Sequence, residues 1–347
     1  MPLYPPETST AIDPEPPASL HESCFAGVDI GGTNLRVAIS NSTGGIVDRW
    51  STSTKGIRDP GEIVDLISQG VTSLMDRNAI SCAALRTIAA GAPGVTNVDQ
   101  GIVIATSYLM GWRDVPLRDL LETAMGVPAF VDNDVNMAAF GESRAGAAQG
   151  FRDFVFLGIG TGLGAGIILN DQLLYGNDWT AGEIGYLLVP GTSISPVDRG
   201  NPGALEAIVG GEGIQAHWNS LWSESSSTLQ RDATATEIFD YALQNNPLAR
   251  AILGLSSRTL AYAIYNMSLI LNCPLFVLGG SVGLHPALGD HVRATLKDLS
   301  VRVQPRVVAS SLGSEAQLTG AVFRALELAK AGSVRVAPVS IDSANID

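Results

Sequence analysis

The sequence predicts an α/β protein built from two similar halves. Its 347 residues suit about two domains of ordinary size. Strand-like apolar runs alternate with segments of helical periodicity along the chain. Both halves open with a strand, a turn rich in Gly and Thr, and a second strand, at residues 25–39 and again at residues 154–169. This repetition indicates a duplicated domain.

The first half is expected to begin with an antiparallel meander. Strands over residues 25–30, 35–39 and 46–52 are separated by turn-forming residues. Pro60 then starts a helix in which apolar residues recur at the helical period. The same reasoning predicts the remaining elements of this half: a strand at 88–90, a helix at 116–125, a strand at 129–131 and a helix at 135–144.

The second half is expected to repeat this opening. Strands at residues 154–159 and 163–169 lead through an Asn-Asp turn into a third strand at 172–175. Further helices are predicted at 234–243, 249–271 and between the last two strands, which are expected at 275–278 and 306–309.

The domain boundaries follow from these elements. We expect an N-terminal α/β domain over residues 24–132, which a last helix at 314–332 completes, and a C-terminal α/β domain over residues 133–313. Residues 1–23, which contain six prolines, are expected to form a disordered tail, and residues 333–347 a second tail.

Composition and charge exclude several classes of protein. Lys and Arg number 21 against 34 Asp and Glu, so the net charge of −13 repels nucleic acid and anionic lipid, and neither is expected as a partner. No apolar run approaches the ~20 residues of a membrane span, and the start lacks a signal peptide, so we expect a cytoplasmic protein. The three cysteines are scattered and predict neither a disulfide framework nor a zinc knuckle.

Glycine is over-represented, at about 11% against a usual value of about 7%. Part of the excess lies in three turns, at residues 29–34, 158–164 and 278–281. Turns of Gly and Thr let backbone N–H groups converge on an anion, with the hydroxyl as an extra donor. Each turn alone could be an ordinary hairpin. Two at matching places in the two halves favour a site that grips a triphosphate.

Two other nucleotide-binding classes are excluded. Gly160, Gly162 and Ala165 have the spacing of the dinucleotide-binding fingerprint, which must lead into a helix. Residues 164–169 are instead β-prone, which argues against a dehydrogenase. No G-x-x-x-x-G-K-[ST] string is present, so the chain is not a P-loop enzyme.

Six motifs resemble those of the ROK family of bacterial sugar kinases and repressors, within the actin, Hsp70 and hexokinase superfamily. They occur in the family's order over about residues 25–330, at 28–36, 91–94, 131–136, 158–164, 182–185 and 278–280. The resemblance implies two ribonuclease-H-like α/β domains with mixed sheets flanked by helices, and an active-site cleft between them. It also implies an ATP-dependent kinase.

The resemblance also implies roles for individual residues. Asp134 would be the general base, because phosphoryl transfer needs a carboxylate to accept the hydroxyl proton. Asp29 would hold hydrated Mg²⁺. Substrate contacts are expected at Gly94, Tyr108, Asn133, Glu183, Tyr186 and Glu206, and ATP contacts at Asp29, Gly31, Gly32, Thr33, Asn34, Gly160, Thr161, Gly162, Gly279 and Gly280. Three of these residues also have plainer interpretations, Asn133 as a helix cap and Glu183 and Glu206 as structural carboxylates.

Two positions depart from the family pattern. Tyr186 stands where similar glucokinases have a His that contacts sugar and is the first ligand of a structural zinc ion. No Cys or His lies between Tyr186 and Glu206, so no zinc site is expected. Tyr108 stands where hexose kinases commonly have an Asn that donates to a ring hydroxyl.

These aromatic replacements leave two interpretations of the substrate. The favoured one is a hexose-like polyol with fewer or rearranged hydroxyls, phosphorylated at a primary hydroxyl, because zinc-less relatives include kinases of valiolone-type C7-cyclitols in antibiotic biosynthesis. The chain looks similar to that branch. The alternative is an unchanged hexose or N-acetylhexosamine substrate, as in a glucokinase.

Proteins of other classes are also considered. A repressor of this family needs a DNA-binding module of about 80 residues, by analogy with those regulators, whereas 28 residues precede Asp29 here. A sugar-binding protein without catalysis is the better non-enzyme alternative, although Asp134 and both phosphate turns argue against it. Relatives are often dimers, which leaves a homodimer open.

Overall fold

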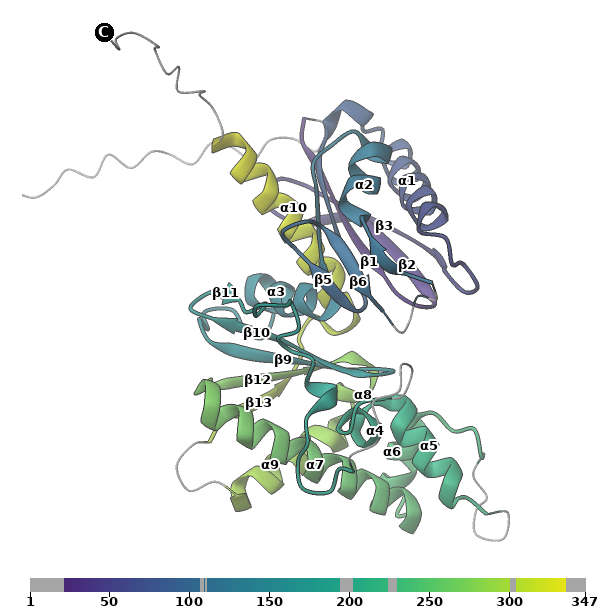
Figure 1. Ribbon diagram of the computed structural model, residues 1–347, viewed down its shortest axis with the longest axis vertical. Helices are drawn as coiled ribbons and strands as arrows, with labels where there is room; N and C mark the ends of the chain where they lie inside the picture. The colour runs from purple at the N-terminus through teal and green to yellow at the C-terminus, as the bar shows by residue number, and fades with distance from the viewer. Residues whose placement is uncertain are drawn as a thin grey trace, which may run out of the picture.

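Two five-stranded mixed sheets lie one above the other in the computed structural model, with helices on both faces of each (Figure 1). The structure describes residues 22–106, 109, 111–193, 202–223, 230–299 and 304–334. The predicted α/β fold of the actin and hexokinase type is confirmed. The predicted tails lie outside the described residues, apart from the few positions next to the first strand and in the last helix.

The N-terminal sheet has the strand order β3-β2-β1-β4-β8. An antiparallel meander forms its first part, as predicted, from β1 (Cys24–Ile30), β2 (Asn34–Ser40) and β3 (Ile46–Ser53). The strands β4 (Leu85–Ala92) and β8 (Ala129–Asn133) continue it in parallel with β1. Because β1 is central, all seven of its residues are buried.

Alternate faces of β1 pack against different helices, as the period of two in a strand requires. Ala26, Val28 and Ile30 share a core with α1 (Pro60–Arg77) and α2 (Leu117–Met125). Phe25 on the other face shares a core with α3 (Asp134–Ala145) and α10 (Ala316–Val334). The last helix of the chain therefore covers the first strand.

The C-terminal sheet repeats the same topology in the order β11-β10-β9-β12-β13. The hairpin of β9 (Phe154–Ile159) and β10 (Leu163–Leu169) is antiparallel, and β12 (Leu275–Gly279) and β13 (Arg306–Ala309) run parallel to β9. The sheet order thus supports the predicted duplication. The edge strand β11 spans only Gln172–Leu173, so the expectation of a strand to residue 175 is wrong.

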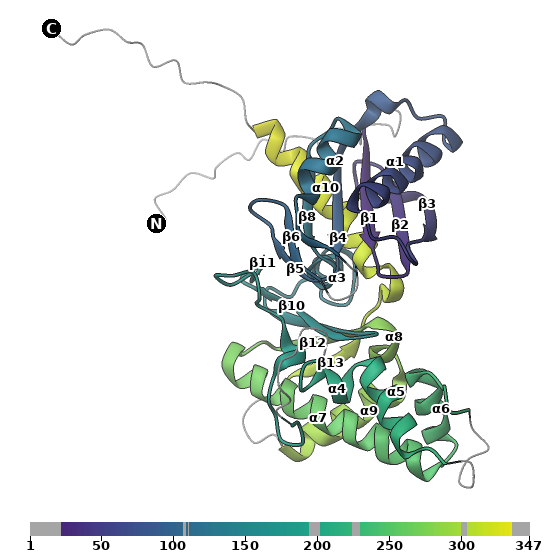
Figure 2. The same ribbon diagram turned by 45° about the vertical axis from the view of Figure 1, so that its right-hand side comes forward.

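Helices cover the outer face of the C-terminal sheet (Figure 2). The long α7 (Pro247–Leu271) begins at the cap Asn246 and ends where Asn272 adopts a left-handed conformation. The helix α6 (Ala235–Leu243) begins with a capping box between Thr234 and Glu237. The other helices here are α4 (Glu206–Val209), α5 (Gly211–Leu221), α8 (Gly280–Gly283) and α9 (Pro286–Leu299).

Several elements were not expected from the sequence. A small sheet of β5 (Val95–Asn97), β6 (Ile102–Ala105) and β7 (Arg113–Val115) follows β4, and its strands are too short to show clear periodicity. The helix α5 was also missed. Three single-turn helices, η1 (Cys82–Ala84), η2 (Ile184–Tyr186) and η3 (Gly313–Glu315), complete the described elements.

Candidate active site

The predicted base Asp134 lies at the start of α3, directly after β8. Its carboxylate is held by the Val135 amide, which donates to Oδ1 at 2.9 Å. Asn133 caps the helix, because its side-chain oxygen accepts from the amides of Val135 and Asn136 at 2.8 and 3.1 Å. The cap turns the chain sharply from strand to helix and leaves Asp134 on the first helical turn.

Asn133 has a second structural contact. Its side-chain Nδ2 donates to the Gly94 carbonyl at 2.9 Å. Gly94 adopts φ +99, and a side chain there would overlap the Ala105 carbonyl, so only glycine fits. The capping interpretation of Asn133 is therefore confirmed. Nδ2 carries a second hydrogen, which leaves one donor for a substrate, and both residues line a pocket.

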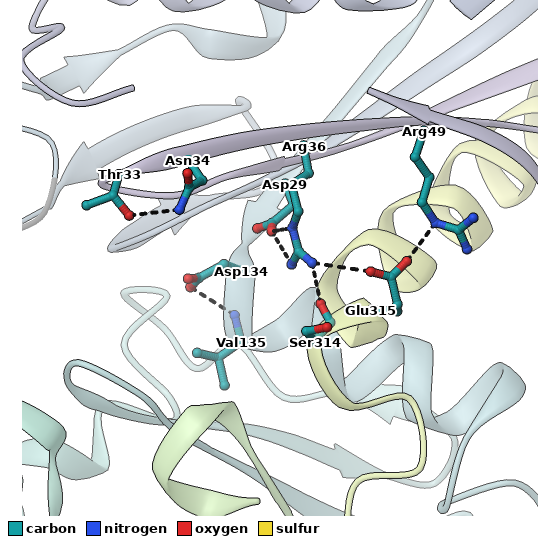
Figure 3. A network of polar contacts seen from close by, with 9 residues as sticks. All are labelled: Asp29, Thr33, Asn34, Arg36, Arg49, Asp134, Val135, Ser314 and Glu315. Atoms are coloured by element: carbon teal, nitrogen blue, oxygen red, sulfur yellow. Dashed lines mark hydrogen bonds and ion pairs between the residues drawn. The ribbon is translucent and has the colours of Figure 1, made fainter. Parts of the chain in front are cut away.

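Asp29, at the end of β1, is buried and paired with Arg36. The register of the β1–β2 hairpin puts the two residues directly opposite each other. The Nε and Nη2 of Arg36 donate to Asp29 Oδ2 at 2.8 and 2.6 Å, and Glu315 also contacts Arg36 (Figure 3). Burial raises the pKa of Asp29 above its ordinary value, while the Arg36 charge opposes this.

The structure brings the second and third glycine turns together. Gly280 lies so close to Ile159 and Gly160 that a side chain at Gly280 would overlap the Ile159 carbonyl, and its φ of +78 also favours glycine. On the other side, the Gly211 amide donates to the Gly160 carbonyl at 2.8 Å and the Glu212 amide to the Thr161 carbonyl at 3.1 Å. The start of α5 therefore supports the second turn.

Val135 places this second turn beside the predicted base. A Cβ added at Gly158 or Gly164, which flank the turn, would lie 3.2 Å from the Val135 side chain. The start of α3 therefore lies on top of the β9–β10 hairpin. Asp29 acts on Asp134 from the other side, through the repulsion of two negative charges. Asp134 is thus situated between the two halves (Figure 3).

The predicted substrate carboxylates also converge. The Leu205 amide donates to the Gly185 carbonyl at 2.9 Å, which joins the two segments that carry Glu183 and Glu206. Glu206 accepts from the Leu163 amide at 2.7 Å, so it contacts the strand that follows the second turn. Burial and then Glu206 raise the pKa of Glu183, while burial raises that of Glu206 itself. Tyr186, beside them, is 52% exposed.

A pocket between the two sheets joins part of these residues. Its lining includes Gly94, Asn133 and Glu183, all predicted from the sequence. It also includes Asn136 and Trp179, which sequence reasoning missed. Trp179 lies in a loop with φ +57, so no periodicity of helix or strand identifies it. The one signal in the sequence that could have identified it is its closeness to the Gly-Glu motif at residues 182–183. The predicted contact Tyr108 lies outside the described residues.

The electrostatics of the site suit a base. Burial, followed by the charge of Asp29 and then that of Glu183, raises the pKa of Asp134 to about 7. A carboxylate with this pKa is a stronger base than an ordinary carboxylate, which suits it to accept a hydroxyl proton, and about half of it is ionised near neutral pH. Perturbed carboxylates of this kind are typical of catalytic sites.

The turns fit the phosphates of a nucleotide. The exposed amides of Gly32 and Thr161 have no protein acceptor within the described part of the chain, so they are free to donate to an anion. A Cβ at Gly160 would meet no atom within 4 Å, which shows that the second turn faces open space. Oδ1 of Asp29 has no hydrogen-bond donor among the described residues, and a carboxylate oxygen suits hydrated Mg²⁺.

Comparisons with known proteins decide the family. The model of the ROK family matches residues 25–328. This chain belongs to the ROK family. The sequence-based assignment is thereby confirmed.

Two curated relatives and one solved structure illustrate the similarity. A glucokinase of Halalkalibacterium halodurans is 31% identical over 85% of this chain and 93% of its own length. An N-acetylmannosamine kinase of Escherichia coli is 31% identical over 74% of this chain and 82% of its own. The structure of a ROK family glucokinase from Streptomyces griseus, in complex with glucose and AMPPNP, matches with a TM-score of 0.73 and 26% identity, over 89% of this chain and 100% of that one.

The described residues carry neither a metal-binding cluster nor a membrane-spanning helix. Among these residues, no group of three or more His, Cys, Asp or Glu is arranged to hold a metal ion. Part of the segment between Tyr186 and Glu206, residues 194–201, lies outside them, so the expectation that no zinc site forms there stays a prediction. No helix in the described ranges is long and apolar enough to cross a membrane.

Proposed function

We propose that this ROK family protein transfers a phosphoryl group from ATP to a hydroxyl of a hexose or N-acetylhexosamine. One observation carries the proposal: the Asp134 carboxylate, with a pKa of about 7, lies between the two halves, near both phosphate-type turns and the Glu183 carboxylate. A base beside polyol-binding carboxylates and anion-binding turns is the arrangement that hydroxyl phosphorylation requires.

The sugar phosphotransferase class is supported by relatives that match most of the chain. They include a glucokinase that is 31% identical and N-acetylmannosamine kinases of comparable similarity. Hexoses and N-acetylhexosamines are therefore the first classes of acceptor to test.

In the proposed mechanism, Asp134 accepts the proton of the reacting hydroxyl. The Val135 amide, which donates to Oδ1, fixes the orientation of the carboxylate and leaves Oδ2 for the substrate. Asp29, where the Arg36 charge partly offsets the effect of burial, would hold the hydrated metal ion. ATP supplies the phosphoryl group and Mg²⁺ neutralises its charge. The exposed amides of Gly32 and Thr161 would orient the phosphates.

Recognition of the acceptor is assigned to Glu183 and Glu206. Each carboxylate can accept hydroxyl protons at more than one lone pair, which suits a polyol. Asn133 would add the second hydrogen of its amide. The Gly94 carbonyl already accepts from Asn133, so its proposed role is to hold that side chain and to leave room for the acceptor.

A C7-cyclitol acceptor is the second candidate. The observation in its favour is Tyr186, a half-exposed aromatic ring next to Glu183 and Glu206. Burial, followed by the charges of these two carboxylates, raises the pKa of its hydroxyl. A ring at this position would favour an acceptor with a less polar face. Nothing in the relatives tests this preference, and it stays a prediction.

An ADP-coupled assay with the full chain, ATP and Mg²⁺ tests the proposal. The acceptors are glucose, mannose, N-acetylglucosamine, N-acetylmannosamine, fructose and a valiolone-type C7-cyclitol. We expect at least one hexose or N-acetylhexosamine to give the highest kcat/KM. The variant Glu183→Gln should raise the KM of that acceptor and leave the KM of ATP unchanged.

The alternatives give different results in the same assay. If the cyclitol is the only acceptor that is phosphorylated, the proposed hexose or N-acetylhexosamine acceptor is wrong and the C7-cyclitol takes its place. No turnover of any acceptor, with sugar binding still detected by calorimetry, would refute the kinase assignment in favour of a sugar-binding protein.

A further inference from the structure

The residue before the catalytic turn, Asp132, has a carboxylate whose two oxygens hold different parts of the molecule. It is fully buried at the end of β8. Oδ1 accepts from the Asn133 amide at 2.7 Å and from the Asn136 side chain at 3.0 Å. Oδ2 accepts from the hydroxyl of Tyr175 at 2.9 Å. One carboxylate therefore connects two separate segments.

The Oδ1 contacts hold the turn that carries the base. Asn133 and Asn136 precede and follow Asp134 by one and two positions, and Asn133 caps the helix. With the Asn133 amide and the Asn136 side chain both bound to one oxygen, the first turn of α3 has little freedom to rotate. The direction in which Asp134 projects depends on this contact.

The Oδ2 contact holds the loop that carries Glu183. Tyr175 lies just after β11, and its carbonyl accepts from the Ala181 amide at 3.1 Å. This bond closes residues 175–181 into a compact loop. The loop and the residues after it supply Trp179, Ala181, Gly182 and Glu183 to the pocket. The Tyr175 hydroxyl is thus the point at which this loop is fastened to the N-terminal sheet.

Arg324, on α10, completes the group. It donates to the Tyr175 hydroxyl at 3.3 Å and lies over the Phe140 ring, with its guanidinium carbon 3.8 Å from the ring centroid. Its Nη1 also contacts Glu327 at 3.1 Å. A buried carboxylate is expensive unless it is paired and hydrogen-bonded, and apolar residues could fill the same space at no such cost. A buried carboxylate whose two oxygens both accept hydrogen bonds, as those of Asp132 do, is suited to fixing one geometry.

We propose that Tyr175 and Asp132 form a positioning pair that sets the place of the Glu183 loop relative to Asp134. Neither side chain touches the substrate in this assignment. The hydrogen bond joins residues 43 positions apart, one in each half, and the loop that it fastens lines the pocket together with Asn133. The inference rests on the proposed function, and it adds residues that hold the acceptor site together.

The variant Tyr175→Phe tests the pair, because it removes only the hydroxyl. We expect the KM of the sugar to rise on the order of tenfold, since a hydrogen bond to a charged group is lost. The KM of ATP should stay within about twofold, because the nucleotide turns do not contact Tyr175. Hydrogen exchange of the amides of residues 176–183 should become faster.

Tyr241→Phe is the matched control. Tyr241 is a half-buried tyrosine of the C-terminal half, with its ring 6.2 Å from that of Trp218 and far along the chain from the pocket residues. The control should leave both KM values and the exchange of residues 176–183 unchanged. Equal effects of the two variants would assign Tyr175 a general role in stability and overturn the proposal.

A second variant covers the case in which Tyr175→Phe does not fold. In Asp132→Asn, Oδ1 can still accept from Asn133, while the amide nitrogen at the other position no longer accepts from the Tyr175 hydroxyl, so the bond to a charged acceptor is lost. We expect the same rise in the sugar KM. In the double variant the two effects should not add, because both remove one contact. Additive effects would contradict the pair.

The results separate this proposal from the proposed function. If the wild-type protein phosphorylates a sugar and Tyr175→Phe has an unchanged sugar KM, the positioning pair is wrong and the kinase assignment stands. If the wild-type protein phosphorylates none of the sugars, the kinase assignment fails. The exchange of residues 176–183 then still decides the pair, since unchanged exchange in Tyr175→Phe would overturn it.

Discussion

At the scale of single residues, charge distribution explains the properties of Asp134. The carboxylates of Asp29, Asp134 and Glu183 act on one another in a partly buried space. Asp29 is paired with Arg36, whereas Asp134 has no cationic partner among the described residues. Burial disfavours the negative charge on both groups, but Arg36 partly offsets this at Asp29, whereas the charges of Asp29 and Glu183 add to it at Asp134. The two groups are thereby suited to different tasks, Asp29 beside a cation and Asp134 as a proton acceptor.

Replacement of the base should abolish most turnover. In Asp134→Asn the side chain keeps its size and its oxygen can still accept from Val135, but it cannot take a proton. We expect kcat to fall by about 10²–10⁴-fold, measured by ADP release with the best acceptor. Asp119→Asn, at an exposed position on α2, is the control. Near-normal turnover of Asp134→Asn would contradict its role as the base.

The pH dependence should report the raised pKa. The base works only when it is ionised, so kcat/KM should rise with pH up to about 7, by roughly tenfold per unit on the acid side, and level off above it. The measurement is kcat/KM for the acceptor from pH 5 to 9, with the coupling enzymes in excess at each pH. The rise of kcat/KM between pH 5 and 7 should be absent from the residual activity of Asp134→Asn, because this variant lacks the titrating carboxylate. A wild-type profile that is flat from pH 5 to 8 would refute the assignment.

At the scale of elements, α3 and α10 connect the two halves and cross at very short distance. A Cβ at Gly320 would overlap the Met137 carbonyl, and one at Gly141 would overlap the Ala316 carbonyl. Buried Glu142, on α3, also binds the segment between β13 and α10, because it accepts from the Ser310 hydroxyl and from the Leu312 amide. The helix that begins with Asp134 is thus held tightly at its far end.

A methyl group at the crossing should destabilise the protein. Gly320→Ala forces the helices apart, and we expect a loss of about 1–3 kcal/mol in the free energy of unfolding, measured by urea denaturation. Gly254→Ala, in the middle of α7, is the matched control because a Cβ there meets no atom within 4 Å. The control should be neutral or stabilising, by up to about 1 kcal/mol. Equal effects at both sites would show that the crossing is less tight than the structure indicates.

At the scale of the whole molecule, the two ends of the chain depend on each other. Leu318, Ala321, Val322 and Ala325 of α10 are almost fully buried and pack with Phe25 of β1. At Gly27, a Cβ would lie 2.7 Å from Val322, so the helix rests directly on the strand. The face of the N-terminal sheet that α10 covers is therefore left with only α3 against it until α10 is in place.

Truncation tests this dependence. A chain that stops after residue 315 lacks α10, and we expect it to be insoluble or to lose its cooperative thermal transition, because that apolar face is exposed. A chain that stops after residue 334 is the control, and it should melt like the full chain in circular dichroism. A cooperative transition in the shorter chain would show that the first domain folds without its last helix.

Local patterns determined much of this architecture from the sequence alone. The hairpins at both glycine turns, the helices with caps at Asp59 and Thr234, and the strand-to-helix turn at Asp134 all depend on neighbours in the chain. Propensity, capping and turn chemistry act over a few residues, so the sequence displays them directly. The order of the motifs was sufficient for the family.

Only the tertiary structure decided which distant residues meet. Neither periodicity nor motif spacing indicates that Tyr175 reaches Asp132, that Glu206 binds the Leu163 amide, or that Arg36 lies beside Glu315. Such contacts depend on the packing of whole elements, and that packing is set by the sum of many weak apolar contacts over both halves. The chain supplies the catalytic carboxylate locally, and the fold supplies its surroundings.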